Sequence, residues 1–151
     1  MISSQEVAKL RAETGAGVMD CQKALEEADG DFDKAKKILA NNAQAIAEKK
    51  SERPARHGLI ECYSHIGKIG VVLELSCESD FVARNQEFKN LAHELAMQIA
   101  SMNPQNIDEL MTSIYIRDES MTVKNLIEHA ISKIGENIQV KRFVRFELGE
   151  E

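Results

Sequence analysis

Four histidines and three cysteines are the side chains of this 151-residue sequence best suited to nucleophilic, acid–base or metal chemistry. The closest pairing is Cys62-x-x-His65, which could begin a metal site or form a thiol–imidazole pair. The surrounding residues alternate as in a β-strand, where these two side chains would point to opposite faces. The remaining histidines are scattered over different expected elements, at His57, His93 and His129. We therefore do not expect catalysis at this pair.

Glu78 and Asp80 are the other candidates, because two neighbouring carboxyl groups can divide general acid and base roles. Nothing in the sequence brings a substrate-sized pocket to them, and an Asp at the start of a helix is usually a cap. The chain also lacks a Gly-rich phosphate loop and the HExxH and GxSxG patterns. The sequence gives no case for an enzyme, and we expect neither a bound metal nor a cofactor.

Composition indicates a folded protein. Hydrophobic residues make up 43% and charged residues 29% of the chain, which is enough to fill a core and stay soluble. The net charge of -6 and the low aromatic content disfavour direct nucleic-acid binding. An odd number of cysteines without CxxC spacing favours a reducing compartment. With no signal-peptide pattern and no membrane-spanning apolar run, we expect a cytoplasmic location and no membrane contact.

Residues 1–42 are expected to form a three-helix module. Ser3-x-x-Glu6 is a capping-box pattern, and Gly15 and Gly30 stand where the first two helices should end. Between the first two helices, the glycines of residues 14–19 could turn Val18 and Met19 outward. Helical periodicity leaves open whether these two side chains face solvent or pack inside.

Residues 43–56 change to alanines and charges and end near Pro54, which indicates a helical linker. Four basic side chains lie in this stretch, and they either contact an anion or form a solvated face: Lys49, Lys50, Arg53 and Arg56.

Residues 57–151 are expected to form an α+β core. Two alternating runs around Ile66-Gly67-Lys68 indicate an antiparallel hairpin, and a third strand follows near the C-terminus. We expect this third strand to place Ile138, Val140, Val144 and Phe146 on one face. Two helical patterns, at residues 88–99 and 123–134, should cover one side of the sheet. A free sheet edge could then pair with a second copy, which makes a homodimer possible.

Three stretches together resemble the elongation factor Ts family, the guanine-nucleotide exchange factors for elongation factor Tu. They are residues 10–25 (LRAETGAGVMDCQKAL), residues 74–85 (ELSCESDFVARN), and residues 133–138 (KIGENI) leading into Arg142-Phe143. The resemblance runs over nearly the whole chain in the same order.

The resemblance implies a ubiquitin-associated-like N-terminal domain that docks on the nucleotide-binding domain of elongation factor Tu. At matching positions, it assigns the first contact to Val18, Met19 and Lys23, and a supporting contact to Ile134 and Gly135. It assigns displacement of Mg²⁺ from Tu to the run Ser79, Asp80, Phe81 and Val82, with the Phe81 ring as a wedge between two helices of the GTPase. His65 resembles a histidine of the second core subdomain in longer relatives.

The chain departs from that pattern in ways that affect the expected function. Ser79 replaces the usual Thr, Gln22 replaces a frequent Lys, and few residues separate Pro104 from Thr122, where longer relatives carry a coiled-coil excursion. A single core would need a homodimer to rebuild a two-subdomain platform, with His65 supplied by the partner chain.

Two other classes of function stay open. One is a ubiquitin-associated-like adaptor without exchange activity, which would use Val18 and Met19 but not Phe81. The other is a thiol enzyme that uses Cys62 or Cys77.

Overall fold

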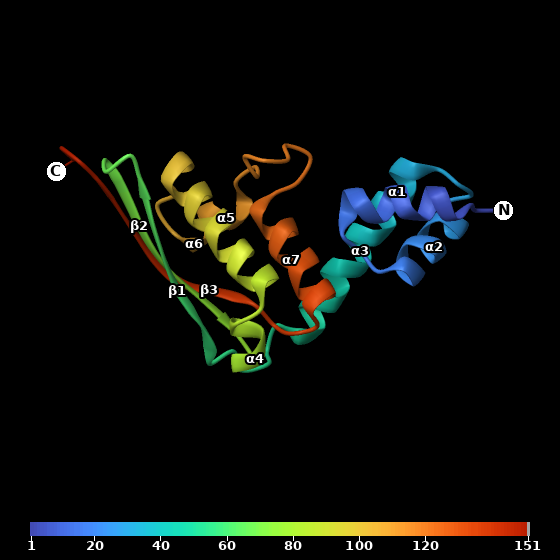
Figure 1. The fold of residues 1–151 in the computed structure, drawn as a ribbon, viewed down its shortest axis with the longest axis horizontal. Helices are drawn as coiled ribbons and strands as arrows, with labels where there is room; N and C mark the ends of the chain where they lie inside the picture. Colours follow the sequence, from blue (N-terminus) through green and yellow to red (C-terminus); the bar gives the residue numbers. More distant parts are fainter. Residues whose placement is uncertain (151) are drawn as a thin grey trace.

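The computed structural model describes residues 1–150 and contains two hydrophobic cores joined by one long helix (Figure 1). A small helical module carries the N-terminus, and a larger core of helices packed on a sheet carries the C-terminus. The expected α+β class is confirmed.

The N-terminal module contains α1 (Ser4–Thr14), α2 (Val18–Glu27) and the first half of α3 (Phe32–Lys50). The capping box forms as expected, because Ser3 accepts from the Glu6 amide while the Glu6 side chain accepts from the Ser3 amide. Gly15 ends α1 with a left-handed backbone, φ +73°. The three helices enclose a small core of Val7, Leu10, Cys21, Ala24, Leu25, Ala28, Ala35 and Leu39.

Helix α3 is continuous from Phe32 to Lys50, so most of the expected linker is the second half of the third helix. Asp31 caps its start by accepting a hydrogen bond from the Lys34 amide. Leu39 packs in the N-terminal core and Ala47 in the larger one. The helix therefore contributes to both cores. The domain limits 1–42, 43–56 and 57–151 stay predictions.

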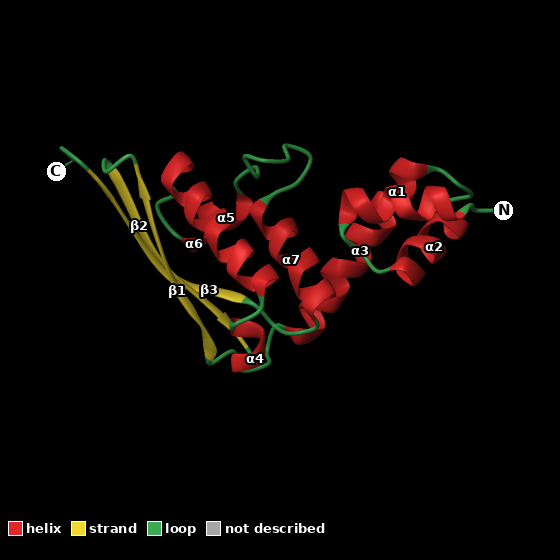
Figure 2. Cartoon of the chain, viewed as in Figure 1, coloured by secondary structure: helices red, strands yellow, loops and turns green. Residues whose placement is uncertain are grey.

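The sheet has three antiparallel strands in the order β1 (His57–His65), β2 (Ile69–Cys77) and β3 (Gln139–Glu147) (Figure 2). The expected β1–β2 hairpin is present, and its register pairs His57 with Cys77 and His65 with Ile69. The hairpin thus begins beside the end of β2 and turns at the far end of the sheet.

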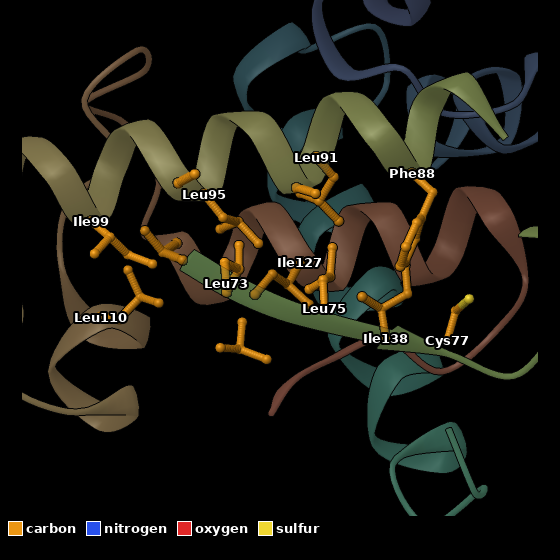
Figure 3. Close-up of a cluster of buried hydrophobic side chains, with 14 of the residues drawn as sticks. Leu73, Leu75, Cys77, Phe88, Leu91, Leu95, Ile99, Leu110, Ile127 and Ile138 are labelled. Carbon is orange, nitrogen blue, oxygen red and sulfur yellow. The ribbon is translucent and has the colours of Figure 1, made fainter. Parts of the chain in front are cut away.

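Four helices follow β2 and lie on one face of the sheet: α4 (Asp80–Ala83), α5 (Gln86–Met102), α6 (Ile107–Thr112) and α7 (Val123–Ile134) (Figures 1 and 2). The inward side chains of β2, Leu73, Leu75 and Cys77, meet those of α5, which include Phe88 and Leu95 (Figure 3). None of the helices in residues 1–150 is long and apolar enough to span a bilayer.

The expected third strand is present, but the expectation that Ile138, Val140, Val144 and Phe146 share one face is wrong, because β3 contains an irregularity. The β2–β3 register shifts between Glu74 and Leu75, which inserts one extra residue in β3 and reverses the alternation beyond it. Val140 therefore packs in the core, whereas Val144 is 42% and Phe146 73% exposed. The outer face of the sheet carries exposed apolar side chains from all three strands, beside the Glu74–Arg142 ion pair: Ile60, Cys62, Val72, Val144 and Phe146.

A cleft of about 560 Å³ separates the N-terminal module from the larger core, and His129 of α7 lies along it. Burial lowers the pKa of His129 below its ordinary value, against a smaller opposing effect of Glu128. Because the pKa of His129 is lower in the folded state than in the unfolded state, the unfolded chain binds a proton at this histidine first as the pH falls. The contribution of His129 to the free energy of unfolding is therefore complete above the unfolded-state pKa and is lost as the pH falls through the folded-state pKa.

We therefore expect the free energy of unfolding to fall as the pH is lowered from about 7.5 to about 5.5. The substitution His129→Asn should flatten this dependence. Urea unfolding at both pH values measures the difference. An unchanged pH dependence in His129→Asn would exclude this histidine as its source.

Candidate functional site

Phe81 is the most prominent exposed aromatic side chain of the larger core, with 82% of its surface accessible. It lies in the first turn of α4, which Ser79 caps by accepting a hydrogen bond from the Val82 amide at 3.2 Å. The next two residues, Val82 and Ala83, are buried in the hydrophobic core. The turn is thus anchored through its inner residues, and the Phe81 ring stands outward on a fixed support.

Asp80, beside the ring, is also exposed and pairs with Arg84 one turn later. The Arg84 Nε atom donates to Asp80 Oδ2 at 2.9 Å. This hydrogen bond and the guanidinium charge hold the pKa of Asp80 below its ordinary value. The ring is therefore flanked by a carboxylate that stays ionised at neutral pH.

The 78–82 turn is tied to the end of α7 by one carboxylate. Glu136 Oε1 accepts from the backbone amides of Glu78 and Ser79, each at 3.0 Å. Its other oxygen, Oε2, accepts from the Ser79 hydroxyl at 2.6 Å. These contacts join two segments that are more than fifty positions apart in sequence.

In a second set of contacts, the segment after α7 is the donor and Glu78 is the acceptor. The Asn137 amide donates to Glu78 Oε2 at 2.6 Å, and Arg53 lies 3.7 Å from the same oxygen. The Asn137 side chain donates to the Arg53 carbonyl at 2.8 Å. The end of α3 is thereby fixed to the same region, and Lys50 also reaches the Gly135 carbonyl at 3.0 Å. Of the four basic residues expected in a linker, two make contacts within the protein here.

Ile134 and Gly135 lie next to this network at the end of α7. Ile134 is half-buried against the large core, and Gly135 ends the helix in the left-handed region, at φ +88°. This turn brings Glu136 and Asn137 back toward the 78–82 segment. Both lie in the 133–138 stretch that carries the resemblance, but the sequence analysis assigned them no role, because nothing local indicated their partners.

Val18 and Met19 begin α2 in the N-terminal module and are 47% and 61% exposed. The alternative left open by periodicity is thus settled in favour of the outward orientation. Lys23, one turn later, is exposed as well. Val18 also borders a groove of about 800 Å³ that continues along α1 past Val7 and Arg11.

The structure does not bring all of the expected site residues together. The N-terminal module carries Val18, Met19 and Lys23. Helix α4, which carries Phe81, lies beside the end of the hairpin at which β1 begins and β2 ends (Figure 1). His65 is at the far end of β1, eight residues after the first residue of the strand, His57, which at strand geometry is roughly 26 Å away. Its Nδ1 lies 2.9 Å from the Tyr63 hydroxyl. In one chain, His65 and Phe81 are therefore separate.

The thiols show no arrangement for nucleophilic chemistry. Cys77 is buried, and burial followed by the nearby Glu136 charge raises its pKa to about 11, so its thiolate is scarce at neutral pH. Burial also raises the pKa of Cys21. Cys62 is exposed on the open sheet face. Within residues 1–150, no group of three or more His, Cys, Asp or Glu side chains is placed to hold a metal ion.

The fold and these sites define a class of protein: a small α+β factor whose outward side chains, Phe81, Val18 and Met19, are suited to contact with another protein. Comparison with known proteins gives the family. The model of the family described as "Elongation factor TS" matches residues 78–151.

Curated relatives match over nearly the whole chain. Elongation factor Ts of Thermodesulfovibrio yellowstonii is 40% identical over 193 aligned positions, which cover 99% of this chain and 97% of the relative. Elongation factor Ts of Thermotoga maritima is 42% identical over 193 positions, with the same coverage. That of Coprothermobacter proteolyticus is 42% identical over 195 positions, covering 99% of both proteins.

The chain belongs to the elongation factor Ts family and is a translation elongation factor. The aligned stretches are longer than the 151 residues of this chain, so these relatives contain internal positions that it lacks.

Proposed function

We propose that this chain is a guanine-nucleotide exchange factor for elongation factor Tu: it binds the GDP-bound GTPase, displaces Mg²⁺ and promotes GDP release so that GTP can bind. The observation that carries the proposal is Phe81, an aromatic ring held 82% exposed on a turn that is anchored from below. An exposed aromatic ring on a rigid support has the properties that a wedge between two helices requires.

The N-terminal module makes the first contact in this proposal, through the outward side chains of Val18, Met19 and Lys23. Ile134 and Gly135 support the contact of the larger core with the GTPase. The module and α4 lie far enough apart to engage two places on one partner (Figure 1). The first contact contributes affinity, and the second contributes the exchange step.

The exchange step belongs to Ser79, Asp80, Phe81 and Val82. Ser79 and Val82 hold the turn through the cap and the core, while Asp80 and Phe81 face the partner. Mg²⁺ requires near-ideal octahedral oxygens, so a wedge that moves a ligand-bearing helix by ~1 Å weakens its binding and that of the phosphates it holds. No covalent chemistry occurs in this chain. This chain and the nucleotide favour different conformations of the GTPase, so they compete for binding to it.

A homodimer is part of the proposal, and the open sheet face favours it. Ile60, Val72 and Phe146 form an apolar surface on one side of a three-stranded sheet, a kind of surface that commonly packs on another sheet. His65 lies at the far end of the sheet from Phe81 in the same chain. In a homodimer, the second copy would supply the histidine to the surface that carries Phe81. Sedimentation at micromolar concentration tests this, and a single-chain mass with exchange activity intact would contradict it.

Linkage gives the test of the proposed function. An exchange protein lowers the affinity of the GTPase for GDP, and GDP with Mg²⁺ lowers the affinity of the GTPase for the exchange protein by the same ratio. We expect the chain to bind nucleotide-free Tu more tightly than Tu·GDP·Mg²⁺, by roughly tenfold or more for a coupling of ~1.4 kcal/mol or above. Titration calorimetry with both forms measures this ratio.

Equal affinities would instead support an adaptor that binds Tu or another protein through Val18 and Met19 without exchange. The proposed place of action is the cytoplasm, with no direct contact to nucleic acid.

A further inference from the structure

We propose that Glu136 is a positioning residue for the exchange step: its carboxylate fixes the 78–82 turn so that Phe81 meets the GTPase at one angle. Glu136 does not itself touch the partner in this proposal. The inference rests on the proposed function and adds to it the residue that makes the wedge rigid.

The geometry leads from the carboxylate to the residues on both sides of the ring. One oxygen of Glu136 accepts from the amides of Glu78 and Ser79, and the other accepts from the Ser79 hydroxyl. The same hydroxyl oxygen accepts from the Val82 amide. A continuous chain of hydrogen bonds thus runs from Glu136, just after α7, through Ser79 to Val82, and Phe81 lies within the stretch that it closes.

Local structure alone would not hold this turn. Helix α4 has four residues, far fewer than an isolated helix needs to be stable in water. Val82 and Ala83 anchor its inner side, but the strand end before it, at Glu78 and Ser79, depends on partners from elsewhere in the chain. Hydrogen bonds to an ionised carboxylate are stronger than those between neutral groups, so Glu136 is well suited to supply them.

Removal of the carboxylate should therefore loosen the turn without unfolding the core. The substitution Glu136→Ala leaves two amides and one hydroxyl without this acceptor. The reciprocal contact from the Asn137 amide to Glu78 is retained. We expect the turn to stay in place on average but to sample a wider range of angles, which lowers the fraction of encounters in which the ring is correctly aimed.

The experiment compares Glu136→Ala, Glu136→Gln and, as a matched control, Glu119→Ala at an exposed loop position. The rate of fluorescent GDP release from Tu is measured against the concentration of each full-length variant. For Glu136→Ala we expect the saturating rate to fall by about tenfold or more, with the half-saturating concentration changed by less than about threefold. Docking through the N-terminal module should be preserved, so the effect falls on the rate rather than on binding.

The conservative variant separates positioning from charge. In Glu136→Gln the amide oxygen can still accept from both backbone amides, and the Ser79 hydroxyl can rotate to accept from the new NH₂ group. We expect this variant and Glu119→Ala to keep most of the wild-type rate. Backbone hydrogen exchange of residues 78–82 should be faster in Glu136→Ala than in the other two variants, a readout that does not depend on Tu.

The failures of the two proposals are distinguishable. If the wild-type chain does not accelerate release, the proposed function itself is wrong. If the wild type is active and Glu136→Ala releases GDP equally fast, or if it loses binding and rate in the same proportion, the positioning role is overturned.

Discussion

Replacing Phe81 with Ala is expected to lower the saturating rate of GDP release by roughly tenfold to hundredfold. The ring is 82% exposed in the free chain, so the energy of its burial becomes available only when it enters the partner. Burying a Phe side chain contributes ~1.5–3 kcal/mol, and each ~1.4 kcal/mol is a factor of ten. The methyl group that remains is also too small to hold two helices apart.

The affinity for nucleotide-free Tu should fall less than the rate does, because the N-terminal contact is unchanged. Stopped-flow release and calorimetric binding, run on the same variant, measure the two effects. The exposed Met102 at the other end of α5 provides a control, since Met102→Ala removes apolar surface far from the turn. A full release rate in Phe81→Ala would contradict the wedge.

The second large effect concerns the hairpin that begins beside this turn. Gly58 in β1 has φ +144°, a region that favours glycine, and a Cβ added there would overlap the Leu75 carbonyl oxygen and crowd the Ser76 Cα. Both obstacles are backbone atoms of the paired strand, so they cannot move aside as a flexible side chain would. The substitution Gly58→Ala should therefore separate β1 from β2 where β2 leads into residues 78–82.

We expect Gly58→Ala to destabilise the protein by at least ~3 kcal/mol and to lower the melting temperature by roughly 6–12 °C. Gly70 of the same hairpin is the matched control, because a Cβ there meets no atom within 4 Å and its φ is not in the glycine region. Thermal unfolding followed by circular dichroism compares the two. Equal melting temperatures for both variants would show that the sheet can absorb the overlap.

Much of the fold was predictable from local sequence, because local signals dictate it. The Ser3 capping box, the glycine that ends α1 and the period-two runs around Gly67 each produced the expected element. The third strand was predicted, but the face on which its later side chains lie was not. Its bulge depends on how β3 pairs with Glu74 and Leu75, and pairing between distant strands leaves no mark in a pattern read along one strand.

Part of the candidate site was likewise predictable from the sequence, and part was not. The outward position of Val18 and Met19 was left open, since apolar residues at the start of a helix fit either a core or a surface. Phe81 was singled out by family resemblance, whereas its supports at Glu136 and Asn137 were not. Those residues act through contacts with a segment more than fifty positions away, which only the folded chain reveals.

The release of a fluorescent GDP analogue from purified elongation factor Tu, at millimolar Mg²⁺ and with increasing amounts of this chain, tests the exchange function most directly. The wedge predicts a release rate that rises with concentration of the chain and then saturates. An unchanged rate at concentrations where calorimetry shows the folded chain bound to Tu would contradict it, and would leave a binding protein without exchange activity.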